Sequence, residues 1–288
     1  MEFFFDMNIS KLYNIFKEYP AITTDSRNIK KDSIFFALKG ENFNGNKFAE
    51  EALKSGCKYA VIDEKEYEIN ENYILVNNAL KTLQQLASFH RDNINIPIIA
   101  ITGTNGKTTS KELITSCLSS ELETAYTKGN YNNHIGVPLT LLEINKKHEI
   151  GIIEMGANHK NEINFLCEIA KPSYGIITNI GKAHLEGFKN FEGVKSTKKE
   201  LYDFINKNNG VIFINNDDKT LNEISKNIKS ITYGKNGDIV GEEVTSSVYT
   251  EVLFNKIKIN SNLIGSYQFY NIMLAIAVAQ HFSIKKKI

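Results

Sequence analysis

The sequence predicts an α/β protein in which a small mixed α/β N-terminal domain precedes a P-loop central domain with a mostly parallel, helix-covered sheet. Three observations support this fold class. In the later two thirds of the chain, apolar runs alternate with helical patterns, which is typical of a parallel sheet. One of these runs leads into a glycine loop and a helical pattern, over Ile96–Thr109. A polar segment, Arg91–Asn95, separates this region from an earlier one with shorter strands, so we expect domains at 1–93 and 94–288.

The composition is that of an ordinary soluble globular protein. The chain carries 34 basic and 33 acidic side chains, a net charge of +1, which gives no reason to expect binding to nucleic acid or to a membrane surface. No stretch approaches the roughly 18 apolar residues of a membrane span, and the N-terminus lacks the basic region of a signal peptide. The three cysteines have no CxxC spacing and suit buried, reduced thiols. We therefore expect a cytoplasmic monomer that binds neither nucleic acid nor membranes.

The elements of the first domain follow from local patterns. Apolar residues at helical spacing predict helices over 8–18 and 80–90, and Asn46 is placed to cap a helix that stops at Gly56. Short apolar runs predict four strands, at 22–24, 34–38, 59–62 and 73–76.

The second domain has longer apolar runs and more regular helical patterns. The runs predict strands at 96–102, 122–126, 150–154, 174–179, 210–214 and 229–233. Helical patterns lie between them, at 107–119, 160–170, 191–206 and 218–227. The stretch 239–260 alternates like antiparallel β structure, and a last helix is expected over 267–282.

A glycine loop joins an apolar run to a helical pattern, and Lys107 and Thr108 follow it directly. Such a loop forms a phosphate cradle, because glycines let backbone N–H groups approach phosphate oxygens and the helix N-terminus adds a partial positive charge. The lysine adds a full charge, and the threonine hydroxyl can hold Mg²⁺. The spacing GxxGKT is shorter than the usual GxxxxGK(S/T), since Ile101 stands where the first glycine of that pattern would be. The residues expected to bind nucleotide phosphates are Gly103, Thr104, Asn105, Gly106, Lys107, Thr108 and Thr109.

Two further segments follow predicted strands, at Glu154–Asn158 and Asn179–Gly187. Open α/β sheets bind ligands at the carboxyl ends of their strands, so these segments should lie near the glycine loop. Glu154 either caps a turn or, beside a P-loop, acts as the second-strand Mg²⁺ ligand, which is the reading we favour. His184 is either a half-buried or capping histidine or a member of this cluster, although Mg²⁺ prefers oxygen ligands.

Five segments in this order resemble the Mur ligases of peptidoglycan synthesis. They are TGTNGKTT (102–109), GNYNNHIGVPLTLLE (129–143), EMGAN (154–158), TNIGKAHLEGF (178–188) and KSTKKEL (195–201). In the first domain, TTDSR (23–27) and IFFALKGENFNG (34–45) resemble the uridine-nucleotide domain of the same ligases. The segments NNHIGVPLTLL and AHLEGF are similar to those of the members that add D-alanyl-D-alanine to UDP-N-acetylmuramoyl-tripeptide.

This resemblance implies a ligase that uses ATP and Mg²⁺. ATP would phosphorylate the free carboxylate of the UDP-N-acetylmuramoyl-peptide to an acyl phosphate, which the amine of D-alanyl-D-alanine would attack. Two like charges ~4 Å apart repel by roughly 4 kcal/mol at an effective dielectric constant near 20, so the site needs cations. By the resemblance, Lys107 and two Mg²⁺ ions supply them. The implied catalytic residues are Lys107, His184 and Lys198, and the implied metal ligands are Thr108, Glu154, His184 and Lys198.

The resemblance gives Lys198 and Asn271 specific roles. Lys198 lies fourteen residues after His184, where these ligases have a carbamoylated lysine. A carbamate offers oxygens to Mg²⁺, whereas an ammonium would be repelled; the alternative is an exposed lysine on a basic helix face. Asn271 ends the family's adenine motif, GxHNxxN, but here Tyr267 and Gln268 replace the histidine and the first asparagine.

The resemblance also points to residues for the sugar nucleotide. Arg27 suits a diphosphate through its bidentate guanidinium, although Asp25–Asn28 has ordinary turn composition. The substrate-binding candidates are Ser26, Arg27, Asn42, Asn46, Asn132 and Asn133.

Other functions remain open from the sequence. The family has a third domain that brings the incoming amine, and nothing in the chain resembles it, so we expect that domain to be absent and ligation by the chain to be weak. The chain could instead be a non-catalytic module that binds nucleotides or UDP-sugars. It could also be another Mur-type amide ligase or a folylpolyglutamate synthetase, although the Asp25–Arg27 segment argues against the folate enzyme.

Overall fold

The computed structural model describes residues 8–181, 188, 190–244 and 248–285 of the chain. They pack as two compact units. The first contains the residues up to Asn95 together with His134–Asn145, and the second contains Ile96–Asn133 and the residues from Lys146 onward. The predicted boundary after residue 93 lies close to the first of these divisions but assigns 134–145 to the other part. The functions given to the two domains stay predictions.

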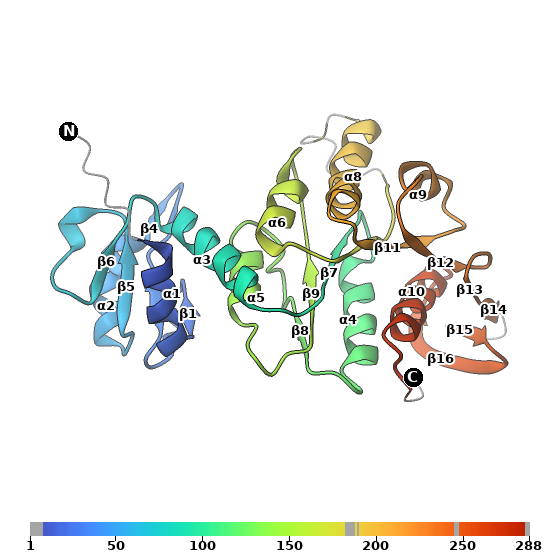
Figure 1. Cartoon of the computed structure of the whole chain (residues 1–288), viewed down its shortest axis with the longest axis horizontal. Coiled ribbons are helices and arrows are strands. Elements are labelled where there is room, and N and C mark those ends of the chain that lie inside the picture. Colours follow the sequence, from blue (N-terminus) through green and yellow to red (C-terminus); the bar gives the residue numbers. More distant parts are fainter. Residues whose placement is uncertain (1–7, 182–187, 189, 245–247, 286–288) are drawn as a thin grey trace. The chain divides into compact units, whose positions relative to one another are not determined.

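The first unit is built on a four-stranded parallel sheet with the order β1-β2-β5-β6 (Figure 1). Its strands are β1 (Ile22–Thr23), β2 (Ile34–Phe36), β5 (Tyr59–Ile62) and β6 (Tyr73–Leu75). Its helices are α1 (Ile9–Glu18), η1 (Gly45–Phe48), α2 (Ala49–Lys54), η2 (Lys65–Tyr67), α3 (Ala79–Asn93) and α5 (Gly136–Leu142). A small antiparallel pair, β3 (Lys39–Gly40) and β4 (Phe43–Asn44), extends from β2.

Local sequence patterns predicted most helices and strands of this unit, but not the elements that depend on contacts between distant residues. The predicted helices and strands are present, whereas the β3–β4 pair and α5 were not predicted. The prediction that Asn46 caps a helix is wrong, because Asn44 caps η1: its Oδ1 accepts the backbone N–H of Asn46 at 3.0 Å. A short asparagine side chain readily accepts the N–H two residues ahead, so the cap lies two residues earlier than expected.

The second unit contains a seven-stranded sheet in which all neighbouring strands pair in parallel, as predicted. The order is β13-β12-β11-β10-β7-β9-β8. The strands are β7 (Ile98–Thr102), β8 (Thr124–Tyr126), β9 (Ile150–Glu154), β10 (Tyr174–Ile177), β11 (Val211–Asn215), β12 (Ser230–Gly234) and β13 (Ile239–Val240). The central strands β7 and β9 are buried along their whole length because helices cover both faces of the sheet.

Helices pack in pairs on the two faces of this sheet (Figure 1). Ile176 contributes to the core under α4 (Lys107–Leu118) and α10 (Gln268–His281). Its neighbour Gly175 faces the other way, because a Cβ there would lie 2.9 Å from Cγ1 of Ile205 in α8 (Phe191–Lys207). Helices α6 (Glu162–Ala170) and α9 (Lys219–Ile224) complete the unit.

The stretch after residue 238 differs in part from the antiparallel prediction. β13 pairs in parallel with β12 and extends the large sheet, so the prediction is wrong for these residues. A strand of two residues is too short to show a periodicity. The remainder forms the predicted antiparallel sheet, with strands β14 (Glu242–Val244), β15 (Tyr249–Phe254) and β16 (Ile257–Ile264). Among the described residues, no helix has the length and apolar character needed to cross a membrane.

Candidate active site

The strand order of the second unit brings three carboxyl ends together. β7 lies between β10 and β9, and it leads into the glycine loop. β9 ends at Glu154, and β10 is followed by Thr178 and Asn179. Loops at the carboxyl ends of neighbouring parallel strands form the ligand site of open α/β sheets, so these residues outline the candidate site.

The two glycines of the loop are required by close contacts and by backbone conformation. Gly103 has a φ of 151°, and a Cβ there would lie 1.9 Å from Oγ1 of Thr178. Gly106 precedes α4 with a φ of 77°, and a Cβ there would lie 3.1 Å from Oδ1 of Asn271. Positive φ values are readily adopted only by glycine, so both positions exclude a side chain.

Residues after β10 hold the glycine loop in shape. Thr178 Oγ1 donates to Asn105 O at 2.6 Å, and Asn179 Nδ2 donates to the same oxygen at 2.9 Å. In return, the backbone N–H of Asn105 donates to Asn179 Oδ1 at 3.1 Å, and that of Thr104 donates to Asn179 O at 3.0 Å. The loop is therefore preorganised by a neighbouring strand. Thr178 was not among the predicted site residues, and the signal for it is a hydroxyl directly after an apolar strand.

The ammonium of Lys107 lies over this loop. Its Nζ donates to Gly103 O at 2.7 Å and to Thr104 O at 3.3 Å. Burial lowers the pKa of Lys107 from its ordinary value, and the nearby charge of Glu154 opposes this effect. Lys107 thus places a positive charge at the glycine loop, and its contact with phosphates stays a prediction.

Glu154 connects the loop helix with a second segment of the site. Its side chain is 2% exposed, and Oε2 accepts the hydroxyl of Thr108 at 3.1 Å. Oε1 accepts Nδ2 of Asn132 at 3.0 Å, and the backbone N–H of Glu154 donates to Oγ1 of Thr127 at 2.9 Å. The structure therefore brings Thr108 and Glu154 into contact and adds Asn132, which was expected to bind substrate instead.

The donor atoms around Glu154 fit a magnesium ion. A carboxylate and a hydroxyl supply hard oxygen ligands, and Mg²⁺ usually takes one or two such groups together with phosphate oxygens and water. Within the described part of the chain, no three His, Cys, Asp or Glu side chains form a closed metal cage. Thr108 and Glu154 could therefore supply two oxygen ligands to such an ion.

Lys198 lies on α8 and is 5% exposed, so the alternative of an exposed lysine is wrong. Burial, together with the positive charge of Lys107, lowers its pKa to about 8. Among the described residues, Nζ has no hydrogen bond or ion pair. The next residue, Lys199, instead pairs with Asp203 on the exposed side of the helix. His184 falls outside the described residues.

Sequence matches agree with this geometry over most of the chain. Residues 101–279 match the Mur ligase middle domain, and residues 18–91 match the catalytic domain of the Mur ligase family. The first match alone covers more than half of the chain. The chain belongs to the Mur ligase family.

Individual Mur ligases match both units. The UDP-N-acetylmuramoyl-tripeptide–D-alanyl-D-alanine ligase of Haemophilus influenzae is 36% identical over 271 residues, which are 90% of this chain and 59% of the relative. The crystal structure of MurF from Acinetobacter baumannii has a TM-score of 0.80 at 32% identity, over 92% of this chain and 60% of that one. MurF from Thermotoga maritima, in complex with ADP, has a TM-score of 0.80 at 28% identity, over 93% and 64%. The chain thus spans about three fifths of the length of these Mur ligases.

The residue predicted to contact adenine lies beside the glycine loop of this Mur ligase. Asn271 is 7% exposed, and its Oδ1 accepts the hydroxyl of Ser110 at 3.1 Å. Its Nδ2 donates to Oε1 of Gln268 at 2.7 Å. Asn271 therefore links α10 to α4 next to Gly106, and its contact with adenine stays a prediction.

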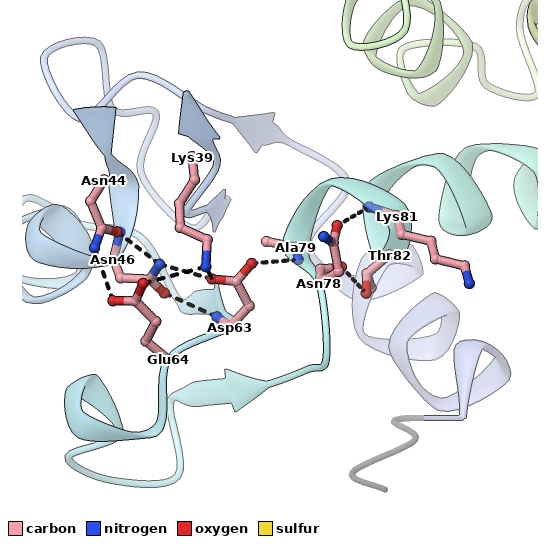
Figure 2. A network of polar contacts seen from close by, with 9 residues as sticks. All are labelled: Lys39, Asn44, Asn46, Asp63, Glu64, Asn78, Ala79, Lys81 and Thr82. Atoms are coloured by element: carbon pink, nitrogen blue, oxygen red, sulfur yellow. Dashed lines mark hydrogen bonds and ion pairs between the residues drawn. The ribbon is translucent and has the colours of Figure 1, made fainter. Parts of the chain in front are cut away.

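In the first unit, two substrate candidates are already engaged by neighbouring side chains. Nε and Nη2 of Arg27 each donate to a different oxygen of Asp25 at 2.8 Å, and this contact lowers the pKa of Asp25 to about 2. Asn46 is 1% exposed, and its amide bonds Asn44 and Asp63 (Figure 2). Direct substrate contacts by Arg27 and Asn46 stay predictions.

The other substrate candidates differ in exposure. Asn42 is exposed between β3 and β4, and Ser26 is half-buried in its turn. In the second unit, Asn133 is exposed and its neighbour Asn132 is bound to Glu154. The predicted substrate residues are thus divided between the two units.

Asp63 is the centre of a polar network that sequence reasoning missed (Figure 2). Its side chain is 4% exposed, and Oδ1 accepts Nδ2 of Asn46 at 2.9 Å and lies 3.0 Å from Nζ of Lys39. Oδ2 accepts the backbone N–H of Ala79, at the start of α3, at 3.2 Å. Lys39 also pairs with Glu64 at 3.3 Å. The network ties the β3–β4 pair to the sheet and to α3.

Proposed function

We propose that this chain carries the sugar-nucleotide and ATP sites of a ligase that adds D-alanyl-D-alanine to UDP-N-acetylmuramoyl-tripeptide. The main support is the convergence of Thr108, Glu154 and Asn132 beside a preorganised glycine loop. The similarity to UDP-N-acetylmuramoyl-tripeptide–D-alanyl-D-alanine ligases supports the choice of substrates. Because the chain spans about three fifths of those relatives, the activity is that of the longer enzyme to which these sites belong.

The residues of the second unit would bind and orient ATP. The loop N–H groups and Lys107 would hold its phosphates, and the fixed shape of the loop lowers the entropy lost when they bind. Mg²⁺, when bound, supplies positive charge to the transferring phosphoryl group. Thr108 and Glu154 would hold that ion, with His184 contributing to a second. Asn271 would position the adenine end.

Lys198 would act as a carbamate. A neutral amine attacks carbon dioxide, an N–C bond forms as one C=O π bond breaks and leaves its electron pair on oxygen, and the nitrogen loses a proton to solvent. A lysine with a pKa of about 8 has far more neutral amine near pH 7.5 than an ordinary lysine, so its environment favours this reaction. The carbamate is anionic, which would relieve the repulsion between Lys198 and Lys107 and offer oxygens to a metal ion.

The first unit would bind the UDP-N-acetylmuramoyl-peptide. Ser26, Arg27 and Asn42 are the accessible candidates, and Arg27 would have to exchange its contact with Asp25 for one with the diphosphate. Asn46 is buried and would support the site through its hydrogen bonds to Asn44 and Asp63. We also propose that the protein is a cytoplasmic monomer that binds neither nucleic acid nor membranes.

Calorimetric titrations of the chain test the proposal. We expect separate binding of ADP with Mg²⁺ and of UDP-N-acetylmuramoyl-tripeptide, with the tripeptide form at least about tenfold tighter than the dipeptide form. Failure to bind either ligand would contradict the proposal. Preference for the dipeptide form would favour a Mur ligase that adds the third residue instead.

Phosphate release distinguishes a ligase from a binding module. With ATP, tripeptide substrate and D-alanyl-D-alanine present, release that disappears in Glu154→Gln supports a ligase. Binding of both ligands without any release by the longer enzyme to which these sites belong would support the non-catalytic alternative, whose residues would be the same.

A further inference from the structure

We propose that Lys111 is a positioning residue that fixes Glu154 and the following segment for the metal ion bound with the nucleotide. The inference rests on the proposed function, because it concerns the same site. Lys111 lies on α4, one turn after Thr108, and none of the roles given above involves it.

Lys111 is a buried cation with a specific backbone partner. Its side chain is 1% exposed, and Nζ donates to the carbonyl oxygen of Thr127 at 2.6 Å. Glu112 lies 2.9 Å from the same nitrogen, but its own side chain is 57% exposed. Removing an ammonium from water is unfavourable, and an apolar side chain would fill this space without that penalty. Nζ also lies 5.9 Å from the centroid of the Tyr126 ring, so the hydrogen bond to Thr127 is its closest buried contact and distinguishes a lysine here from a packing residue.

Thr127 connects Lys111 to the backbone of Glu154. It is fully buried and lies directly after β8. Its N–H donates to Ile152 O at 3.0 Å, and its Oγ1 accepts the N–H of Glu154 at 2.9 Å. Through Thr127, Lys111 restrains the end of β9 from which the Glu154 carboxylate projects.

The segment that begins at Thr127 also reaches the carboxylate itself. Asn132 donates to Glu154 Oε1 at 3.0 Å, and its carbonyl oxygen accepts the N–H of Gly156 at 2.7 Å. On the other side, Thr108 donates to Oε2 at 3.1 Å. Helix α4 thus holds Glu154 twice, directly through Thr108 and through Thr127 by Lys111.

The glycine loop is held by residues other than Lys111. Its shape depends on Thr178 and Asn179, which make no hydrogen bond to Lys111 among the described residues. Loss of the Lys111 contact should therefore disturb the geometry around Glu154 and leave the phosphate loop intact. The affinity gained from Mg²⁺ should fall, whereas the affinity for ADP alone should not.

The test is to titrate ADP into the whole chain with and without Mg²⁺. The measured quantity is the dissociation constant without Mg²⁺ divided by the dissociation constant with Mg²⁺, which is the gain in affinity from the metal ion. We expect Lys111→Met to reduce this ratio at least about fivefold with the metal-free constant unchanged. Lys111→Arg should recover part of it, since a guanidinium can still donate to Thr127. Lys258→Met is the control, because Lys258 also pairs with a glutamate, Glu251, at 2.8 Å, but on the small antiparallel sheet. Its ratio should equal that of the unmodified chain.

Two further measurements keep the test decisive if Lys111→Met fails to fold. Thr127→Val retains the carbonyl and removes only the oxygen that accepts from Glu154, and it should lower the same ratio. Amide exchange without any ligand should be faster at Glu154 and Gly156 in either variant. An unchanged ratio, or an equal loss of ADP affinity with and without Mg²⁺, would overturn the positioning role. If the unmodified chain does not bind ADP, the proposed function fails, and exchange at Glu154 still decides whether Lys111 positions it.

Discussion

Two buried carboxylates, one in each unit, have opposite surroundings. Asp63 accepts an amide and a backbone N–H and pairs with Lys39 at 3.0 Å (Figure 2). Glu154 is also buried, but the donors that it accepts among the described residues are the neutral ones of Thr108 and Asn132. Within the described residues it has no ion pair.

This difference separates a structural charge from a functional one. A carboxylate that already pairs with a lysine gains little from a further cation, because its charge is compensated. A buried carboxylate with neutral donors retains charge that a metal ion can neutralise. Burial alone therefore does not predict a metal ligand, whereas burial without an ion pair favours one.

The largest expected effect comes from neutralising Glu154. Glu154→Gln should weaken ADP binding in the presence of Mg²⁺ by about a hundredfold or more, because the metal loses its charged ligand. The free energy of unfolding should not fall, since a glutamine in this position carries no buried charge. Calorimetry and urea denaturation measure the two quantities. If Glu154→Gln strongly lowered the free energy of unfolding while ADP binding still depended on Mg²⁺, Glu154 would be a structural carboxylate like Asp63.

Removing Asp63 should have the opposite effect: the free energy of unfolding should fall, and ADP binding with Mg²⁺ should not. Asp63→Ala leaves the Asn46 amide and the Ala79 N–H without their partner, and we expect a loss of about 2–4 kcal/mol in the free energy of unfolding. Glu64→Ala is the matched control, because Glu64 contacts the same lysine but is more exposed, and it should cost below about 1 kcal/mol. Equal losses in urea denaturation would show that burial of Asp63 is unimportant.

Lys198 extends the comparison to a buried cation that has no ion pair among the residues described by the structure. Its folded-state pKa of about 8 lies below that of the unfolded chain, so its charge opposes folding fully below pH 8. This penalty should decline between pH 8 and about 10.5 as the unfolded state binds more protons.

In bicarbonate-free buffer, Lys198→Met should therefore be more stable than the unmodified chain at pH 7 by about 2 kcal/mol. The difference should shrink by pH 10. Lys199→Met, whose lysine pairs with Asp203, should show no such pH dependence. A difference that stays constant with pH would mean that Lys198 titrates like an ordinary lysine.

The exposed pair of Asp25 and Arg27 should give the smallest effect. Arg27→Ala should return the pKa of Asp25 from about 2 toward its usual value near 3.9, which NMR titration can follow. Any stability from this pair is present above the unfolded-state pKa and is lost as pH falls through about 2. An unchanged pKa would exclude the bidentate contact and leave Arg27 free for a ligand.

The sequence predicted the fold and the outline of the site because both depend on local patterns. Apolar runs located the strands of the large sheet, and the GxxGKT spacing located Lys107 and Thr108. Glu154 could be identified because it ends such a run. Thr178, Lys111 and Asp63 could not, because their roles depend on partners 73, 16 and 17 residues away in the sequence. A buried lysine and an exposed one also look alike in sequence, as Lys198 shows.

Residues 134–145 belong to the first unit, and this affects where the protein can be cut into fragments. The chain passes between the units three times, after Asn95, Asn133 and Asn145. A fragment starting at Ile96 would carry α5 without α3, the helix on which it packs, and would leave Val137 and Leu141 uncovered. A single protease cut near residue 95 would leave the two fragments held together by the contacts between α3 and α5. Shortened versions of the first unit should therefore keep residues 134–145 together with residues 1–95.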